Sequence, residues 1–171
     1  MNRLFGLSIV LLLLMPLSAR SQQLDFGMTP TDFLHAINTI SGVRVKVRII
    51  SQTSTMIEYG MGQCVVAEGE IDNDQRLDSV RIAPAANDSA CPANDDEMRT
   101  LVAASTAEVM EVLTDVPDID KNAQTLGTLA QNLKQDPASG LRSSEAKVGQ
   151  RTVQMLVTLG GRRSEFVINP E

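Results

Sequence analysis

Residue types that commonly carry out chemistry in proteins are scarce in this sequence. Its 171 residues include two cysteines, Cys64 and Cys91, one histidine, His35, and no tryptophan. An active site built on several histidines or cysteines is therefore excluded. A Ser-His-Asp hydrolase would have to use His35, which falls on the polar side of a predicted helix without any sign of a partner. We therefore predict that the protein is not an enzyme and holds no cofactor.

Acidic residues are the remaining candidates for catalysis or metal binding. Paired carboxylates are plentiful, so spacing selects none of them, and a hydrolase that uses carboxylates alone stays an alternative. Asp72, Asp74 and Asp78 resemble the start of an EF-hand calcium loop, which also needs an oxygen ligand at its fifth position, glycine at the sixth and glutamate at the twelfth. The residues at those positions are Arg76, Leu77 and Ala83. We therefore predict a hairpin turn here and no metal site.

The N-terminal residues have the pattern of a secretory signal peptide. Arg3 precedes a 12-residue apolar stretch, residues 4–15, and a small-residue cleavage site follows. The stretch is too short to span a bilayer, which takes about 20 residues. We predict that residues 1–21 are removed by cleavage after Ser21, with cleavage after Ala19 as the alternative. The mature protein is then periplasmic or secreted, without stable insertion in the membrane.

Export changes the meaning of the two cysteines. In an oxidising compartment, two cysteines in a small domain usually form a disulfide. A redox-active pair would show Cys-x-x-Cys spacing, which Cys64 and Cys91 lack. We predict a structural disulfide that stabilises the fold by about 3–4 kcal/mol in the chain-entropy model. A glycosylation sequon at Asn87 matters only if the secretory pathway is eukaryotic.

The charge of the chain is negative and unevenly distributed. Loss of residues 1–21 removes Arg3 and Arg20 and no acid, so the formal net charge falls from −6 to −8. Residues 68–120 contain 14 acidic and 3 basic residues. Because such a surface repels nucleic acids, and only 3% of the residues are aromatic, we predict no nucleic-acid binding. The acidic segment is either a solvated surface or a site for a cationic partner.

The pattern of residues 29–83 predicts one helix and then four strands. Thr29 is the predicted N-cap, Pro30 takes the first helical position, and Gly42 marks the end of the helix. Its apolar side is formed by Phe33, Leu34, Ile37 and Ile40. The predicted strands span residues 43–50, 57–61, 64–71 and 77–83. In the first strand, three valines and Ile49 alternate with basic residues, which predicts one buried face.

Two more helices are predicted after a loop. Asn94 and Asp118 are their N-caps, the first helix reaches Val116, and the second ends at Pro137. The inward residues predicted for the first helix are Met98, Leu101, Val102, Ser105, Val109, Val112 and Leu113. Those predicted for the second are Ile119, Ala123, Leu126, Ala130 and Leu133.

The C-terminal residues form the clearest predicted hairpin. Residues 152–159 and 162–168 flank Gly160 and Gly161, a two-residue turn that needs positive φ. Pairing across this turn matches Met155 with Phe166, Val153 with Ile168 and Leu156 with Glu165.

The resulting order of elements is α-β-β-β-β-α-α-β-β. This order predicts an α+β fold in which an antiparallel sheet, a meander plus the C-terminal hairpin, carries about three helices on one face. We predict a single domain over residues 22–171, because no linker divides this segment.

Protein binding is the function that these features predict best. Export, acidity, a disulfide-bonded scaffold and the lack of catalytic groups suggest a periplasmic accessory, inhibitor or immunity-type factor, although fold does not imply function. The polar face of the helix after Asp118 starts at Asn122 and is rich in uncharged amides, which are easier to desolvate than charges. The residues predicted to bind a protein partner are Gln124, Thr128, Gln131 and Gln135 on this side, and Glu108, Glu111 and Asp115 before it.

A carrier of a small apolar ligand, held between the sheet and its helices, is the alternative. Methionine side chains are adaptable and suit such a cavity. The candidates are Met28, Met56, Met61, Met98, Met110 and Met155. An apolar cavity would favour the carrier, whereas a solid core beside an exposed apolar patch would favour the protein-binding function.

Overall fold

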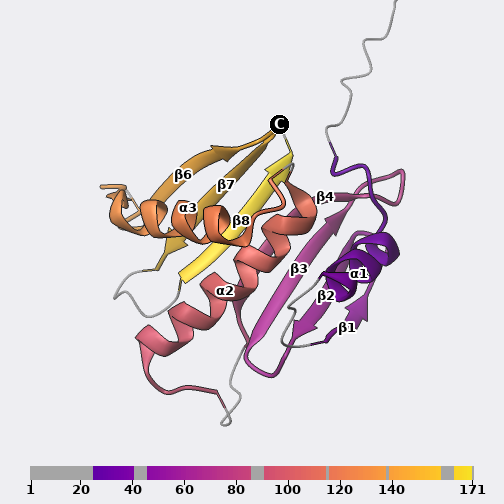
Figure 1. Cartoon of the computed structure of the whole chain (residues 1–171), viewed down its shortest axis with the longest axis horizontal. Coiled ribbons are helices and arrows are strands. Elements are labelled where there is room, and N and C mark those ends of the chain that lie inside the picture. Colours follow the sequence, from indigo (N-terminus) through magenta and orange to yellow (C-terminus); the bar gives the residue numbers. More distant parts are fainter. Residues whose placement is uncertain are drawn as a thin grey trace, which may run out of the picture.

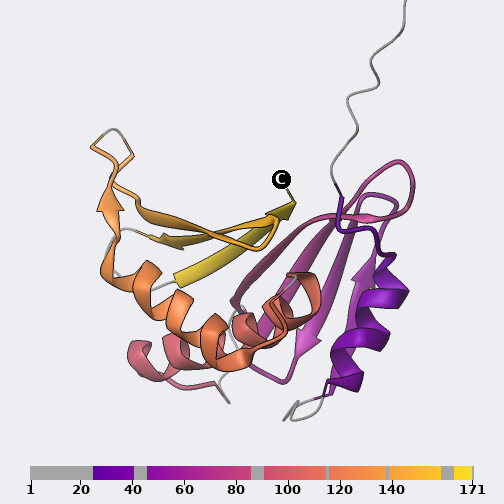
Figure 2. The ribbon, with the colours of Figure 1, turned by 45° about the horizontal axis from the view of Figure 1, so that its top comes forward.

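A computed structural model describes residues 25–40, 46–85, 91–114, 116–137, 139–158 and 164–170. The predicted signal peptide, the Asn87 sequon, Asp115 and the Gly160-Gly161 turn lie outside these residues. The fold is α+β, as predicted, with an antiparallel sheet and helices on one of its faces (Figures 1 and 2). None of the helices in the described ranges is long and apolar enough to cross a membrane.

In the part of the chain that the structure describes, eight antiparallel strands form one sheet in the order β1-β2-β3-β4-β8-β7-β6-β5. Their bounds are β1 Val47–Gln52, β2 Met56–Met61, β3 Val65–Ile71, β4 Leu77–Pro84, β5 Lys134–Gln135, β6 Arg142–Val148, β7 Arg151–Val157 and β8 Ser164–Pro170. Strands β5 and β6 add to the predicted set. Most residues of β6 are polar or small, so its sequence lacks the apolar alternation by which the other strands were predicted.

The described residues form three helices, α1 (Pro30–Thr39), α2 (Asp95–Leu113) and α3 (Ile119–Gln131). Each begins after its predicted N-cap, and the capping side chains accept hydrogen bonds from backbone N–H groups inside the helix. At α1 the predicted capping box is complete, because Asp32 also accepts from the Thr29 backbone. Figure 2 shows the three helices on one side of a strongly twisted sheet.

Helix α1 is fixed to the sheet by aromatic packing and by two hydrogen bonds between the Asn38 side chain and the backbone of β1. The rings of Phe33 and Tyr59 lie 5.0 Å apart, and the Tyr59 hydroxyl donates to the Pro30 carbonyl at 3.0 Å. Burial raises the pKa of Tyr59 above its ordinary value. The Asn38 side chain accepts from the Val47 N–H at 2.8 Å and donates to its carbonyl at 2.9 Å. These two bonds satisfy the N–H and the carbonyl of Val47, where the edge strand β1 begins.

The predicted burial of the first strand is wrong at Ile49. The structure places the strand at residues 47–52, so residues 43–45 of the prediction lie outside the described chain. Val47 is buried, but the Ile49 side chain is exposed. The pairing with β2 is regular from Val47 to Ile49, which lies opposite Tyr59, and the irregularity comes only between Ile49 and Ser51. Ile49 is therefore exposed because β1 is the edge strand of the sheet, and not because the alternation is broken before it.

The acidic β3–β4 connection is a turn, as predicted. The Asp72 carboxylate accepts hydrogen bonds from the N–H groups of Asp74 and Arg76, at 2.9 Å and 2.8 Å. Gln75 has a φ of 62°. Asp72 therefore closes a tight hairpin by accepting hydrogen bonds from the backbone of the turn residues that follow it.

The C-terminal hairpin has the predicted register. Met155 lies opposite Phe166, Val153 opposite Ile168, and Leu156 opposite Glu165. Strand β8 also pairs with β4, where Ile82 lies opposite Phe166. The hairpin therefore lies inside the sheet, and the inward side chains of β7 and β8 become the floor beneath α2 and α3.

Cys64 and Cys91 form the predicted disulfide, with their Cα atoms 5.3 Å apart. Cys64 lies in the β2–β3 turn, and Cys91 precedes the N-cap of α2. The bond closes 27 residues of sequence separation and ties the chain that enters α2 to the sheet.

Candidate functional site

Helices α2 and α3 form a V over strands β7 and β8. The short segment between residues 113 and 119 joins them at the closed end, and Figure 1 shows them diverging from that point. A groove of about 450 Å³ lies between the helices. This volume is in the range of small-molecule binding sites.

Small residues on both helices leave this groove open. They are Ala103, Ala104 and Ala107 on α2, and Ala123, Gly127 and Ala130 on α3. A Cβ atom added at Gly127 would meet nothing within 4 Å. The rest of the lining is formed by Arg99, Thr100, Leu126, Met155, Ser164 and Phe166. The groove is therefore apolar over most of its surface.

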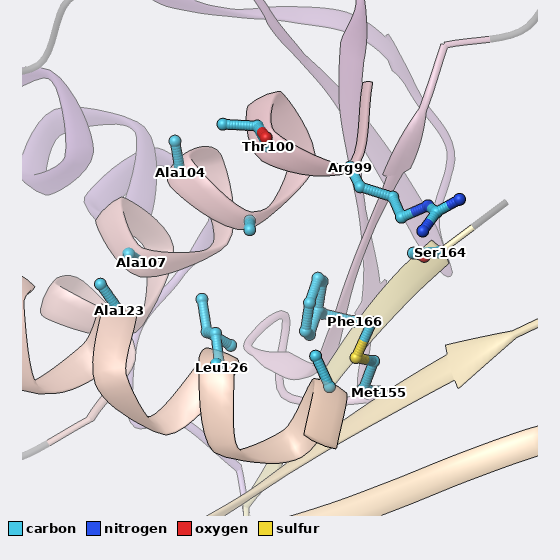
Figure 3. A pocket seen from close by; sticks show the side chains of 12 residues that line it. Arg99, Thr100, Ala104, Ala107, Ala123, Leu126, Met155, Ser164 and Phe166 are labelled. Atoms are coloured by element: carbon cyan, nitrogen blue, oxygen red, sulfur yellow. The ribbon is translucent and has the colours of Figure 1, made fainter. Parts of the chain in front are cut away.

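The floor of the groove is apolar and firmly packed. Met155 and Phe166 are opposite each other on β7 and β8, and both are buried. Leu126 of α3 is buried beside them, and Figure 3 shows the three side chains converging. Because these residues belong to the core, the floor is held in place without any ligand.

The polar lining residues come from the N-terminal half of α2 and the start of β8. Arg99 is the one charged residue among the described residues that line the groove. Its guanidinium lies 3.3 Å from the Asp96 carboxylate, one turn earlier in the helix. Ser164 is only 2% exposed, and its hydroxyl has no hydrogen-bond partner in the part of the chain that the structure describes. A buried hydroxyl without a partner is unusual, so Ser164 is a candidate contact for a polar group in the groove.

The predicted inward side of α3 is wrong in part. Leu126 is buried as predicted, but Ile119, Ala123 and Ala130 are exposed. Asn122, predicted at the start of the polar face, is fully buried, because its side-chain amide donates to the Val116 carbonyl at 3.2 Å. The helix is turned so that its small residues face the groove instead of the core.

Helix α2 shows one similar departure. Leu101, predicted to point inward, is 41% exposed. It lies in a second hollow beside the disulfide, with Met61, Cys64 and Glu108 among its neighbours. Ala104 borders both this hollow and the groove, so the N-terminal half of α2 has a cavity on each side.

The residues predicted to bind a protein partner are distributed over separate surfaces. Gln124 and Thr128 line a hollow with Lys121 and Lys147, away from the groove. Gln131 and Gln135 are exposed, and Asp115 lies outside the described residues. Glu108 borders the Leu101 hollow, and Glu111 is half-buried on α2. The structure thus brings Gln124 and Thr128 together in one hollow and places Glu108 in another.

The six methionines suggested for a ligand cavity also separate. Met155 lines the groove, Met61 lines the Leu101 hollow, and Met110 is in the core. Met56 is exposed, whereas Met28 and Met98 pack against the core from its edge.

The carboxyl groups with clearly shifted pKa values are at helix N-termini. Hydrogen bonds from the Thr29 hydroxyl, and then from its N–H, lower the pKa of Asp32. The Lys121 N–H has the largest part in lowering the pKa of Asp118. Both shifts are opposite to the one that a general acid needs. No cluster of three or more His, Cys, Asp or Glu side chains suited to a metal ion occurs within the described residues.

Sequence reasoning missed Arg99, Ser164 and the small-residue faces of the two helices. One signal for Ser164 was present, because it precedes Phe166 and Ile168 by even spacing and therefore shares their inward face. Ala and Gly on a helix carry little information about which side is buried, so the groove could not be located from α3 alone.

Comparison with known proteins identifies no family for the chain, and it finds a distantly similar solved structure. No family model matches the chain, and a search of curated proteins finds no match. Among solved structures, the chain is similar to a DUF4309 family protein, YjgB, from Bacillus subtilis. The two share 12% sequence identity over 85% of this chain and 80% of that chain, with a TM-score of 0.41.

Proposed function

We propose that this is an exported, non-enzymatic binding protein that holds a small apolar ligand in the groove between α2 and α3. The open, apolar groove of about 450 Å³ carries this proposal. Its walls are made of alanine and glycine where larger side chains would close the helix pair, and its floor is the rigid core around Met155 and Phe166.

The energetic argument rests on apolar surface. Burial of apolar area stabilises a complex by roughly 25 cal/mol per Å², before the costs of association are subtracted. The preformed floor reduces those costs, because the ligand does not have to order it. An apolar molecule of moderate size therefore gains most of its affinity from the shape of this groove.

Export is supported by two independent features. The N-terminal residues have the pattern of a signal peptide, and Cys64 and Cys91 are disulfide-bonded. Disulfides persist in oxidising compartments such as the bacterial periplasm or the extracellular space. We place the ligand and the protein there.

Protein binding is the second candidate, and the exposure of Leu101 favours it. A leucine that is 41% exposed in a hollow beside Glu108 could receive an apolar side chain of a partner. Gln124 and Thr128 are exposed on a different surface, where an amide and a hydroxyl offer hydrogen bonds to such a partner.

A pair of leucine substitutions on α3 distinguishes the two candidates. Gly127→Leu fills the groove, whereas Gln124→Leu adds the same side chain on the polar side of the helix. We expect the mature protein to bind the neutral fluorescent probe N-phenyl-1-naphthylamine, Gly127→Leu to abolish binding, and Gln124→Leu to retain it. Equal binding by wild type and Gly127→Leu, in a folded variant, would refute the groove as the ligand site.

The same variants test the second candidate. A pull-down from the native envelope fraction with the tagged mature chain would reveal a stoichiometric partner. If Gln124→Leu loses that partner while Gly127→Leu keeps it, protein binding through α3 is the function. If no stoichiometric protein comes with the wild-type chain, the protein-binding candidate is rejected.

A further inference from the structure

We propose that the ligand of the groove is an alkyl carboxylate, whose charged end binds Arg99 and Ser164 while its chain lies over Met155 and Phe166. This inference rests on the proposed function and adds the chemical class of the ligand. Four observations carry it: the apolar floor, the unpartnered Ser164 hydroxyl, the charge of Arg99 and the weakness of the ion pair that now holds Arg99.

The Ser164 hydroxyl is the first sign of a polar ligand group. Ser164 lines the groove and is 2% exposed, and its Oγ has neither donor nor acceptor among the described residues. Desolvation of a hydroxyl without a compensating bond is unfavourable. A carboxylate oxygen at this end of the groove would accept a hydrogen bond from the Ser164 hydroxyl and remove that penalty.

Arg99 supplies the positive charge for the same end. Its side chain and Ser164 both contribute to the lining (Figure 3). A guanidinium has five N–H donors, and its ion-pair partner among the described residues is Asp96, at 3.3 Å, so donors remain for a carboxylate. A planar carboxylate fits this donor set in a bidentate arrangement.

The ion pair between Arg99 and Asp96 does not prevent this role. The side chains are 45% and 84% exposed, so water screens their attraction. Two further acids, Asp95 and Glu97, are in the first turn of α2 and are exposed. Neither lines the groove, so Arg99 is the charge that a ligand inside it meets.

The apolar lining limits the ligand to one charged end. Beyond Arg99 and Thr100, the walls are alanine and glycine, and the floor is Met155, Leu126 and Phe166. A second charge in this region would be desolvated without a partner. A monocarboxylate with an unbranched alkyl chain satisfies both parts of the groove.

Decanoate and 1-decanol form a matched pair of probes for this inference. They share the chain length and differ in the charged end. We expect isothermal titration calorimetry to show that the wild-type mature protein binds decanoate at least about tenfold more tightly than 1-decanol, the size of a charge-assisted hydrogen bond. Arg99→Gln should abolish this preference by weakening the binding of decanoate.

Arg81→Gln is the matched control for net charge. Arg81 lies outside the groove lining and pairs with Glu165 at 2.7 Å and Glu68 at 3.4 Å. The Arg81→Gln variant should keep the preference for decanoate over 1-decanol. If Arg81→Gln reduces the preference as much as Arg99→Gln, the attraction is a long-range effect of charge and the inference is wrong.

Two more variants test the geometry. Asp96→Asn frees the guanidinium and should tighten decanoate binding. Ser164→Ala should weaken decanoate binding by about two- to tenfold, the range of one hydrogen bond, without lowering the thermal stability of the empty protein. Unchanged decanoate affinity in folded Ser164→Ala would overturn the assignment of this hydroxyl.

The outcomes separate the inference from the proposed function. If the wild type binds decanoate and 1-decanol equally, and Gly127→Leu weakens both, the groove binds ligands but the carboxylate inference fails. If the wild type binds neither these probes nor N-phenyl-1-naphthylamine, both the inference and the proposed function are rejected.

Discussion

Replacement of Gly127 by alanine should stabilise the protein while it narrows the groove. Gly127 lies inside α3, where glycine costs about 1 kcal/mol relative to alanine. An added Cβ would meet nothing within 4 Å, so the new methyl group causes no clash. Neither packing nor the helix itself accounts for glycine at this position, whereas an open groove does.

The expected increase in the stability of Gly127→Ala can be measured by thermal and urea denaturation. About 1 kcal/mol corresponds to an increase in Tm of roughly 2–4 °C for a protein of this size. In urea, the midpoint should rise while the slope m stays the same, because the variant does not change the area exposed on unfolding. Binding of N-phenyl-1-naphthylamine should weaken, since the methyl group occupies part of the groove.

Gly69→Ala is the matched control, and we expect it to lower the free energy of unfolding where Gly127→Ala raises it. In β3 an added Cβ would lie 2.7 Å from Leu77 Cδ2 and 3.1 Å from Ile57 Cγ2, and both neighbours are buried. Overpacking of this kind costs about 1–3 kcal/mol. If Gly127→Ala is also destabilising, the space beside Gly127 is filled in solution, and the reasoning from an open groove is refuted.

Two further predictions concern the disulfide and the cap of α1. The double variant Cys64→Ser/Cys91→Ser should lower the free energy of unfolding by about 3–4 kcal/mol, measured by urea denaturation, whereas an unchanged midpoint would mean that the disulfide does not constrain the unfolded chain. The pKa of Asp32 is lowered from 3.8 by hydrogen bonds from Thr29, so its stabilising effect is complete above that ordinary value and is lost as the pH falls through the lowered one. Urea midpoints of Asp32→Asn should therefore depend less on pH in acid than those of the wild type, and parallel curves would contradict the assignment.

The parts of the fold that sequence predicted well are those where two signals agree. In the C-terminal hairpin, alternation and a Gly-Gly turn both require Met155 to face Phe166, and the structure has this register. At α1, the Thr29 cap and the apolar stripe with Phe33 and Ile37 identify the same helix and the same buried side. Strand β6 consists mostly of polar or small residues and lacks a clear apolar alternation, so it was not predicted.

The site was predicted poorly because its residues carry weak or opposing signals. Ala123 and Ala130 extend an apolar stripe on α3, which in most helices faces the core. Here they face open space, while Asn122 is buried by its bond to the α2–α3 connection. Hydrophobic periodicity reports which residues avoid water, but it does not say whether the core or a ligand covers them.

Apolar residues that are exposed although the hydrophobic pattern predicts them to be buried therefore indicate where a ligand could bind. On α3, Ala123 and Ala130 are exposed against expectation, and both line the groove. On α2, Leu101 is exposed in the adjoining hollow. Local rules tend to fail at functional sites, because a binding surface must keep apolar groups uncovered until its partner arrives. These three departures are on α2 and α3, whereas Ile49 is exposed on the edge strand β1 and does not line the groove. The groove, rather than the dispersed amides and acids, is therefore the place where we expect a ligand.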